Sequence, residues 1–139
     1  MTTIKTKATD ILEKAKSLFG RQVQVLANQE LKVRELLSNV GKKIAKVGEN
    51  PKVKMVIEPI SIFIRMIKAH FAGTHKLSAS TLGLLLLALI YFLSPVDFIP
   101  DFLGLLGFAD DISVILAVYA KVKNEVDGFL DWEKSQVRS

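Results

Sequence analysis

A run of twenty residues without a formal charge, LSASTLGLLLLALIYFLSPV from Leu77 to Val96, limits the folds that this chain can adopt. Twenty helical residues are about long enough to cross the roughly 30 Å hydrocarbon core of a bilayer, which predicts a transmembrane helix. Only Leu82 to Leu93 is strongly apolar, however, and apolar stretches of about 10–14 residues more often form buried or re-entrant helices. The sequence therefore leaves open whether this helix spans, re-enters or lies in a protein core.

Apolar residues at helical spacing predict further helices on both sides of this run, at about residues 4–19, 21–47, 51–71 and 109–133. Gly20 is expected to end the first of them, and the break at 48–50 places Pro51 in the first turn of the third. Because strand-like alternation is absent, the fold class is all-α with four to five helices. We expect basic amphipathic helices over 1–76 and, over 77–139, a short apolar helical hairpin around a Ser-Pro/Asp-rich turn with an amphipathic tail, together forming one structural unit.

The charges are divided unequally between the two parts of the chain. Residues 1–80 contain fifteen Lys and Arg against six Asp and Glu, whereas residues 81–139 contain four against eight. A basic half favours contact with a membrane surface or a nucleic acid, although a solvated helical face is the simpler reading. The basic residues are spread over several helices without interleaved aromatics, so nucleic acid is not expected. Arg65, Lys68 and Lys76 are predicted to face lipid phosphates.

The segment SPVDFIPDFLGLLGFADD, residues 94–111, holds four aspartates without a basic residue beside them: Asp97, Asp101, Asp110 and Asp111. Ser94 and Pro95 suit the N-cap and N1 positions of a helix, and each aspartate can cap a helical turn through its carboxylate. Capping is the favoured interpretation and needs no cofactor. The alternative is a carboxylate cluster that binds Mg²⁺ or Ca²⁺ or handles protons.

His70 and His75 are five residues apart, a poor spacing for a shared metal on one helix face.

The stretch YFLSPVDFIPDFLGLLGFADD resembles the signature of the YkvA-like family, a bacterial domain of unknown function. The positions that match the signature are Tyr91, Ser94, Pro95, Asp97, Ile99, Pro100, Asp101, Gly107, Asp110 and Asp111. Gly104 departs from the pattern, because the family usually has proline there. The resemblance covers about residues 82–119 and implies a small helical, membrane-associated protein. It implies no activity.

Together these observations predict a non-enzymatic protein that acts as a structural or interaction module at the cytoplasmic membrane, with its N-terminus in the cytoplasm. The expected partner is anionic lipid, with a second copy of the chain or another membrane protein as a further candidate. No small-molecule substrate is indicated. Two alternatives stay open: the metal or ion/proton site at the aspartates, and a soluble helical bundle that dimerises through its apolar helices.

Overall fold

The computed structural model describes residues 3–93 and 111–138 of the chain. Its helices are α1 (Thr3–Ala27), α2 (Glu30–Val47), α3 (Pro51–Ala72), α4 (Ala79–Leu93), α6 (Asp111–Lys121) and α7 (Lys123–Arg138). All regular secondary structure within these two ranges is helical, which confirms the all-α fold class. The described part already contains six helices, one more than the upper end of the prediction.

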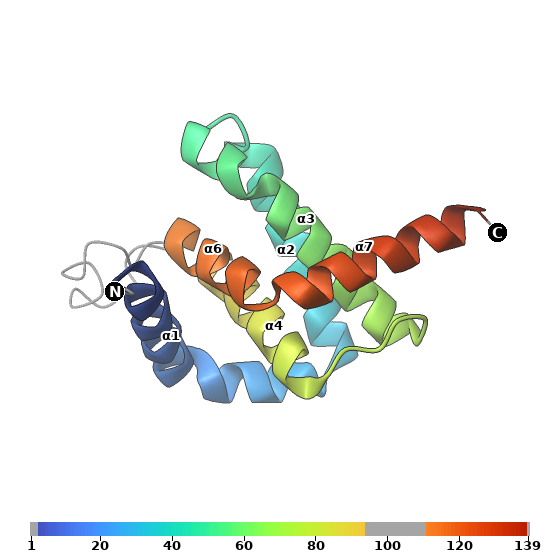
Figure 1. Cartoon of the computed structure of the whole chain (residues 1–139), viewed down its shortest axis with the longest axis horizontal. Helices are drawn as coiled ribbons and strands as arrows, with labels where there is room; N and C mark the ends of the chain where they lie inside the picture. The colour runs from blue at the N-terminus through green and yellow to red at the C-terminus, as the bar shows by residue number, and fades with distance from the viewer. Residues whose placement is uncertain (1–2, 94–110, 139) are drawn as a thin grey trace.

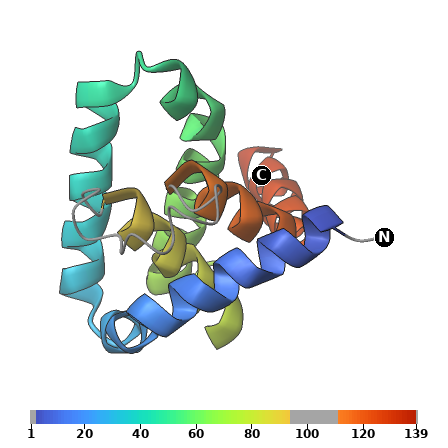
Figure 2. The same ribbon diagram turned by 90° about the vertical axis from the view of Figure 1, so that its left-hand side faces the viewer.

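Helix α4 is the centre of the structure. It packs against α1, α2, α3 and α6, and in Figure 1 it lies with α6 between α1 and α3. Figure 2 shows the same arrangement from the side, with α1 running across one end of the other helices. Each residue from Leu84 to Phe92 is buried, as are Thr81 and Leu82. A helix that is apolar on all sides must be covered on all sides, and here other helices of the same chain provide that cover.

The structure therefore places the strongly apolar part of this run, residues 84–92, in the protein core. Among the helices in the two described ranges, none has the combined length and apolar character needed to cross a membrane. The transmembrane helix that the sequence allowed is accordingly not supported. Helix α4 itself has 15 residues.

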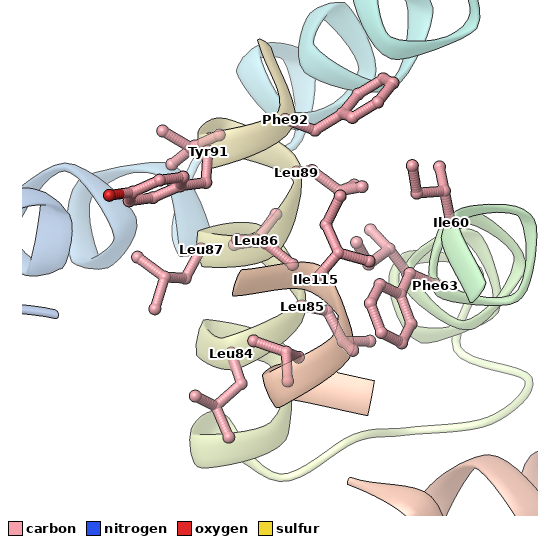
Figure 3. Packing of buried hydrophobic residues seen from close by; sticks show 14 of the residues in the cluster. Ile60, Phe63, Leu84, Leu85, Leu86, Leu87, Leu89, Tyr91, Phe92 and Ile115 are labelled. Atoms are coloured by element: carbon pink, nitrogen blue, oxygen red, sulfur yellow. The ribbon is translucent and has the colours of Figure 1, made fainter. Parts of the chain in front are cut away.

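The core is built by side chains from several helices that meet α4. Figure 3 shows Ile60 and Phe63 of α3 and Ile115 of α6 directed toward the leucines of α4, and all three are fully buried. Helices α4 and α6 lie in contact and run in roughly opposite directions on either side of residues 94–110 (Figure 1). This packing confirms the predicted apolar hairpin, although the turn itself lies outside the described residues.

The predicted end of the first helix at Gly20 is wrong, because α1 continues to Ala27. Glycine inside a helix costs only about 1 kcal/mol relative to alanine, so tertiary packing can override it. The chain breaks instead within the seven-residue gap between the apolar positions Leu26 and Val33. There the Gln29 amide donates a hydrogen bond of 2.9 Å to the Leu26 carbonyl, which closes α1 with a tight turn. The break before Pro51 is confirmed, and α3 begins at that residue.

The single last helix predicted over 109–133 is also wrong, because α6 and α7 meet at Val122 and point in different directions (Figure 1). Helical hydrogen bonds continue through the bend: the Val122 amide donates to the Val118 carbonyl and the Val126 amide to the Val122 carbonyl, each at 2.9 Å. Leu116 of α6 is 39% exposed. Helix α6 packs against α1, α3 and α4, and its buried face is formed by Val114, Ile115, Ala117 and Val118.

We expect that shortening one leucine of α4 will destabilise the whole fold. Leu89 is completely buried, and Leu89→Ala removes its side chain from a core formed by four surrounding helices. The free energy of unfolding, measured by urea denaturation, should fall by about 2–5 kcal/mol. Leu31, which is 81% exposed, supplies the matched control, and Leu31→Ala should change that free energy by less than about 0.5 kcal/mol. Equal effects of the two substitutions would contradict a core centred on α4.

Candidate functional site

Most of the sequence-predicted site residues lie outside the described part of the chain. This applies to Ser94, Pro95, Asp97, Ile99, Pro100, Asp101, Gly107 and Asp110. Asp111 is the first residue of α6. The capping, metal-binding and proton-handling interpretations of the aspartates therefore stay predictions. Within 3–93 and 111–138, no group of three or more His, Asp or Glu side chains is placed to hold a metal ion.

The end of α4 that leads into this segment is fixed by α2. Tyr91 and Phe92 are buried in the core, and Lys43 of α2 donates a hydrogen bond from its Nζ to the Phe92 carbonyl. The same ammonium lies 4.7 Å from the centre of the Phe92 ring. The last carbonyls of a helix lack partners within it, and its negative dipole end attracts a cation. Lys43 therefore stabilises the point at which the chain leaves α4, with a cation–π contact in addition.

Sequence reasoning missed this role of Lys43. The available signal was its position three residues after Val40 and one before Ile44, two apolar residues at helical spacing, which places a long basic side chain at the edge of the apolar face of α2. A lysine at such a position can lay its methylene groups along apolar surface and extend its ammonium to a polar partner. Which carbonyl it reaches depends on how α2 crosses α4, and spacing alone does not specify that crossing.

The three basic residues predicted to face lipid have different settings. Arg65 of α3 forms a bidentate ion pair with Glu133 of α7, with its Nε 2.8 Å from Oε2 and its Nη2 3.2 Å from Oε1. This pair joins α3 to α7 and offsets the Arg65 charge. Lys68 on α3 and Lys76 after its end are both exposed. Contact of these residues with lipid is untested and stays a prediction, for which Lys68 and Lys76 are the better placed.

The two histidines do not form a common site. His70 accepts a hydrogen bond of 2.9 Å at Nδ1 from the Leu77 amide, which ties the loop after α3 back to that helix. The His75 ring lies against Phe129 and Trp132 of α7, with ring centres 5.3 and 5.0 Å away. The two residues thus attach the same loop to two different helices. Both are partly buried, and the aromatic contacts of His75 were not predicted from the sequence.

The environment of His70 favours its neutral form. Partial burial lowers the pKa of His70 below its ordinary value of 6.5, and the nearby positive charge of Lys76 lowers this pKa further. A protonated ring would carry a hydrogen at Nδ1, where the Leu77 amide already points its own hydrogen. Protonation therefore breaks the link between α3 and its following loop.

The outer face of α2, defined here by Leu31, Lys42 and Lys46, is open. Val33, Leu37 and Val40 of the same helix are buried toward α4, so residues about half a turn away point outward. Lys42 and Lys46 are exposed, Leu31 is 81% exposed, and Glu35 is the acidic residue on the same side of the helix. This arrangement places two lysines and a large apolar side chain along one helix surface.

Comparison with known proteins points to the buried hairpin. The family model described as "Protein of unknown function (DUF1232)" matches residues 81–117, which extend from the first turn of α4 into α6. Over 80 residues the chain is 34% identical to a protein of Bacillus subtilis (strain 168) described as "Uncharacterized membrane protein YkvA". That alignment covers 57% of this chain and 76% of the Bacillus protein. No solved structure matches the chain.

We expect the stability of the fold to depend on pH through His70. Since its pKa is lower in the folded than in the unfolded chain, the unfolded chain binds more protons in this range and stability increases with pH. The contribution of His70 is present above the unfolded-state pKa of 6.5 and is lost as the pH falls through the lowered folded-state value. Thermal melts between about pH 7.5 and about pH 5.5 should show this loss, because carboxylates titrate mainly below that window.

His70→Asn supplies the comparison for this measurement. The side-chain carbonyl of the introduced asparagine can still accept the Leu77 hydrogen bond but does not titrate. The variant should therefore show a weaker decrease of melting temperature in acid than the original chain. An unchanged acid dependence in the variant would exclude His70 as its source.

Proposed function

The chain belongs to the YkvA-like family of proteins of unknown function (DUF1232), and we propose that it is a non-enzymatic helical module that binds the cytoplasmic face of a membrane. The contact is made by exposed basic residues on the surface of the fold, chiefly those on the outer face of α2. The Bacillus relative is described as a membrane protein, which supports a location at a membrane.

The observation that carries the proposal is the separation of apolar and basic residues in the fold. The leucines of α4 are enclosed by α1, α2, α3 and α6, so they cannot meet lipid unless that packing is lost. Lys42 and Lys46 are exposed and point away from the core. Attachment from the surface is therefore the favoured mode, in place of a hairpin embedded in the bilayer. For the same reason, dimerisation through α4 would require helices of the same chain to move aside.

The expected attraction is the sum of several weak contacts. Each Lys or Arg close to an anionic leaflet contributes about 1 kcal/mol, and the attraction acts within about one Debye length of the surface. Leu31 lies on the same face and is 81% exposed, so it can enter the headgroup region when the lysines approach phosphates. Several weak contacts of this kind produce binding that salt can reverse.

Vesicle co-sedimentation tests this proposal. The full chain should bind vesicles that contain phosphatidylglycerol, bind phosphatidylcholine vesicles weakly, and dissociate at about 1 M salt, where the Debye length is about 3 Å. The double substitution Lys42→Ala/Lys46→Ala should weaken binding to the anionic vesicles about 30-fold, since two contributions of about 1 kcal/mol are lost.

A matched control separates a specific face from net charge. Lys121→Ala/Lys134→Ala removes the same charge from exposed positions on α6 and α7 and should leave most of the binding intact. If both double variants weaken binding equally, the outer face of α2 is not the contact surface. If the chain ignores anionic vesicles altogether, the proposal is wrong.

A further inference from the structure

A groove of about 540 Å³ lies between α2 and α3, and we propose that it binds a single-chain anionic lipid of the fatty-acid type. Its volume is within the range of about 300–1,000 Å³ that is usual for small-molecule sites. The inference goes beyond surface attachment to a membrane, because it concerns one lipid molecule held by the protein in the absence of a bilayer.

The groove runs along both helices and differs in character between its ends. Helices α2 and α3 are joined by a short turn and run side by side in opposite directions (Figure 2). Its lining on α2 extends from Glu30 to Gly41, about 16 Å at 1.5 Å per residue. Because the helices are antiparallel, the beginning of α2 lies beside the end of α3. The charged residues of the lining therefore lie toward the beginning of α2 and the end of α3, where Phe71 and Ala72 add apolar surface, and no charged residue lines the end near Gly41 and Ile64.

The apolar end is formed by both helices. Leu37 contributes from α2, and Ile64 and Ile67 contribute from α3. Ile67 is fully buried, whereas Ile64 is only partly covered by protein and so presents apolar surface to the groove. Gly41 leaves this end open, since a side chain built there would meet no atom within 4 Å. A hydrocarbon chain gains free energy by covering such surface, whereas a sugar or nucleotide would lose hydrogen bonds to water there.

The charged end favours an anionic head group. Arg34 is paired with Glu30 on the same helix, with its Nη2 2.7 Å from the Glu30 carboxylate, so these two charges offset each other. Lys68 of α3 lines the same end and is exposed. Among the residues that the structure describes, no ion pair involves Lys68. The end therefore carries one positive charge in excess, which complements a single carboxylate at the end of a hydrocarbon chain.

Binding of palmitate by the full chain, measured by calorimetry at monomeric fatty-acid concentrations and without vesicles, tests the inference. The original chain should bind palmitate and bind the uncharged alcohol of the same chain length at least about tenfold more weakly, because a charge-assisted contact with Lys68 is lost. Lys68→Ala should weaken palmitate binding by a similar factor and leave binding of the alcohol unchanged. Lys134→Ala, which removes a lysine from α7, should have no effect on either ligand.

A second substitution tests the apolar end independently of charge. Gly41→Leu places a side chain in the groove and should abolish binding of both ligands. This variant should remain folded, since it replaces a poor helix former on an exposed part of α2. Gly128→Leu on α7 is the matched control, because its added side chain also meets open space, and it should bind as the original chain does.

The proposal is overturned if palmitate does not bind, or if Gly41→Leu and Gly128→Leu bind it equally well. Equal affinity for palmitate and the alcohol would overturn the role of Lys68 in selecting an anion. These calorimetric results are independent of vesicle binding, because Lys42 and Lys46 are outside the groove and no bilayer is present in the assay.

Discussion

Enclosure of α4 by four other helices is the constraint on which the rest of the structure depends. Nine consecutive residues, from Leu84 to Phe92, are buried, so no face of this helix is left for water. The surrounding helices must each turn an apolar stripe toward α4, and their charged residues are consequently displaced to the outside. The basic surface of α2 and the burial of the hairpin are thus two results of the same packing.

This constraint also explains why the ends of α4 and α3 have specific polar contacts. Lys43 donates a hydrogen bond to the Phe92 carbonyl near the end of α4, and His70 accepts one from the Leu77 amide, two residues before α4 begins. The backbone groups at the ends of a buried helix need polar partners. In this chain Ser78 caps the start of α4 by accepting a hydrogen bond of 3.1 Å from the Thr81 amide, His70 of α3 holds the connection before it, and Lys43 of α2 fixes its end.

Sequence periodicity predicted the helical class, the break before Pro51 and the apolar hairpin, because these depend on local composition and burial. It misplaced the end of α1 at Gly20 and missed the bend at Val122, since a glycine and a change of packing partners have no unique local signature. The prediction that Arg65 faces lipid was likewise made without its ion-pair partner Glu133, which is 68 residues away in the chain. Long-range partners of this kind depend on helix crossing, which spacing within one helix does not determine.

The groove between α2 and α3 follows from an excess of apolar surface on α3. Ile60, Phe63 and Ile67 are fully buried in the core, yet Ile64 and Phe71 are only partly covered. The apolar surface of α3 is therefore wider than the area that neighbouring helices cover. Helix α2 covers only one edge of that surface, because Gly41 supplies no side chain there. Apolar surface left in this way is stabilised when a hydrocarbon chain replaces water. Helices α2 and α3, two of the four that enclose α4, thereby provide both the exposed lysines and the uncovered apolar surface on which the proposed lipid binding depends.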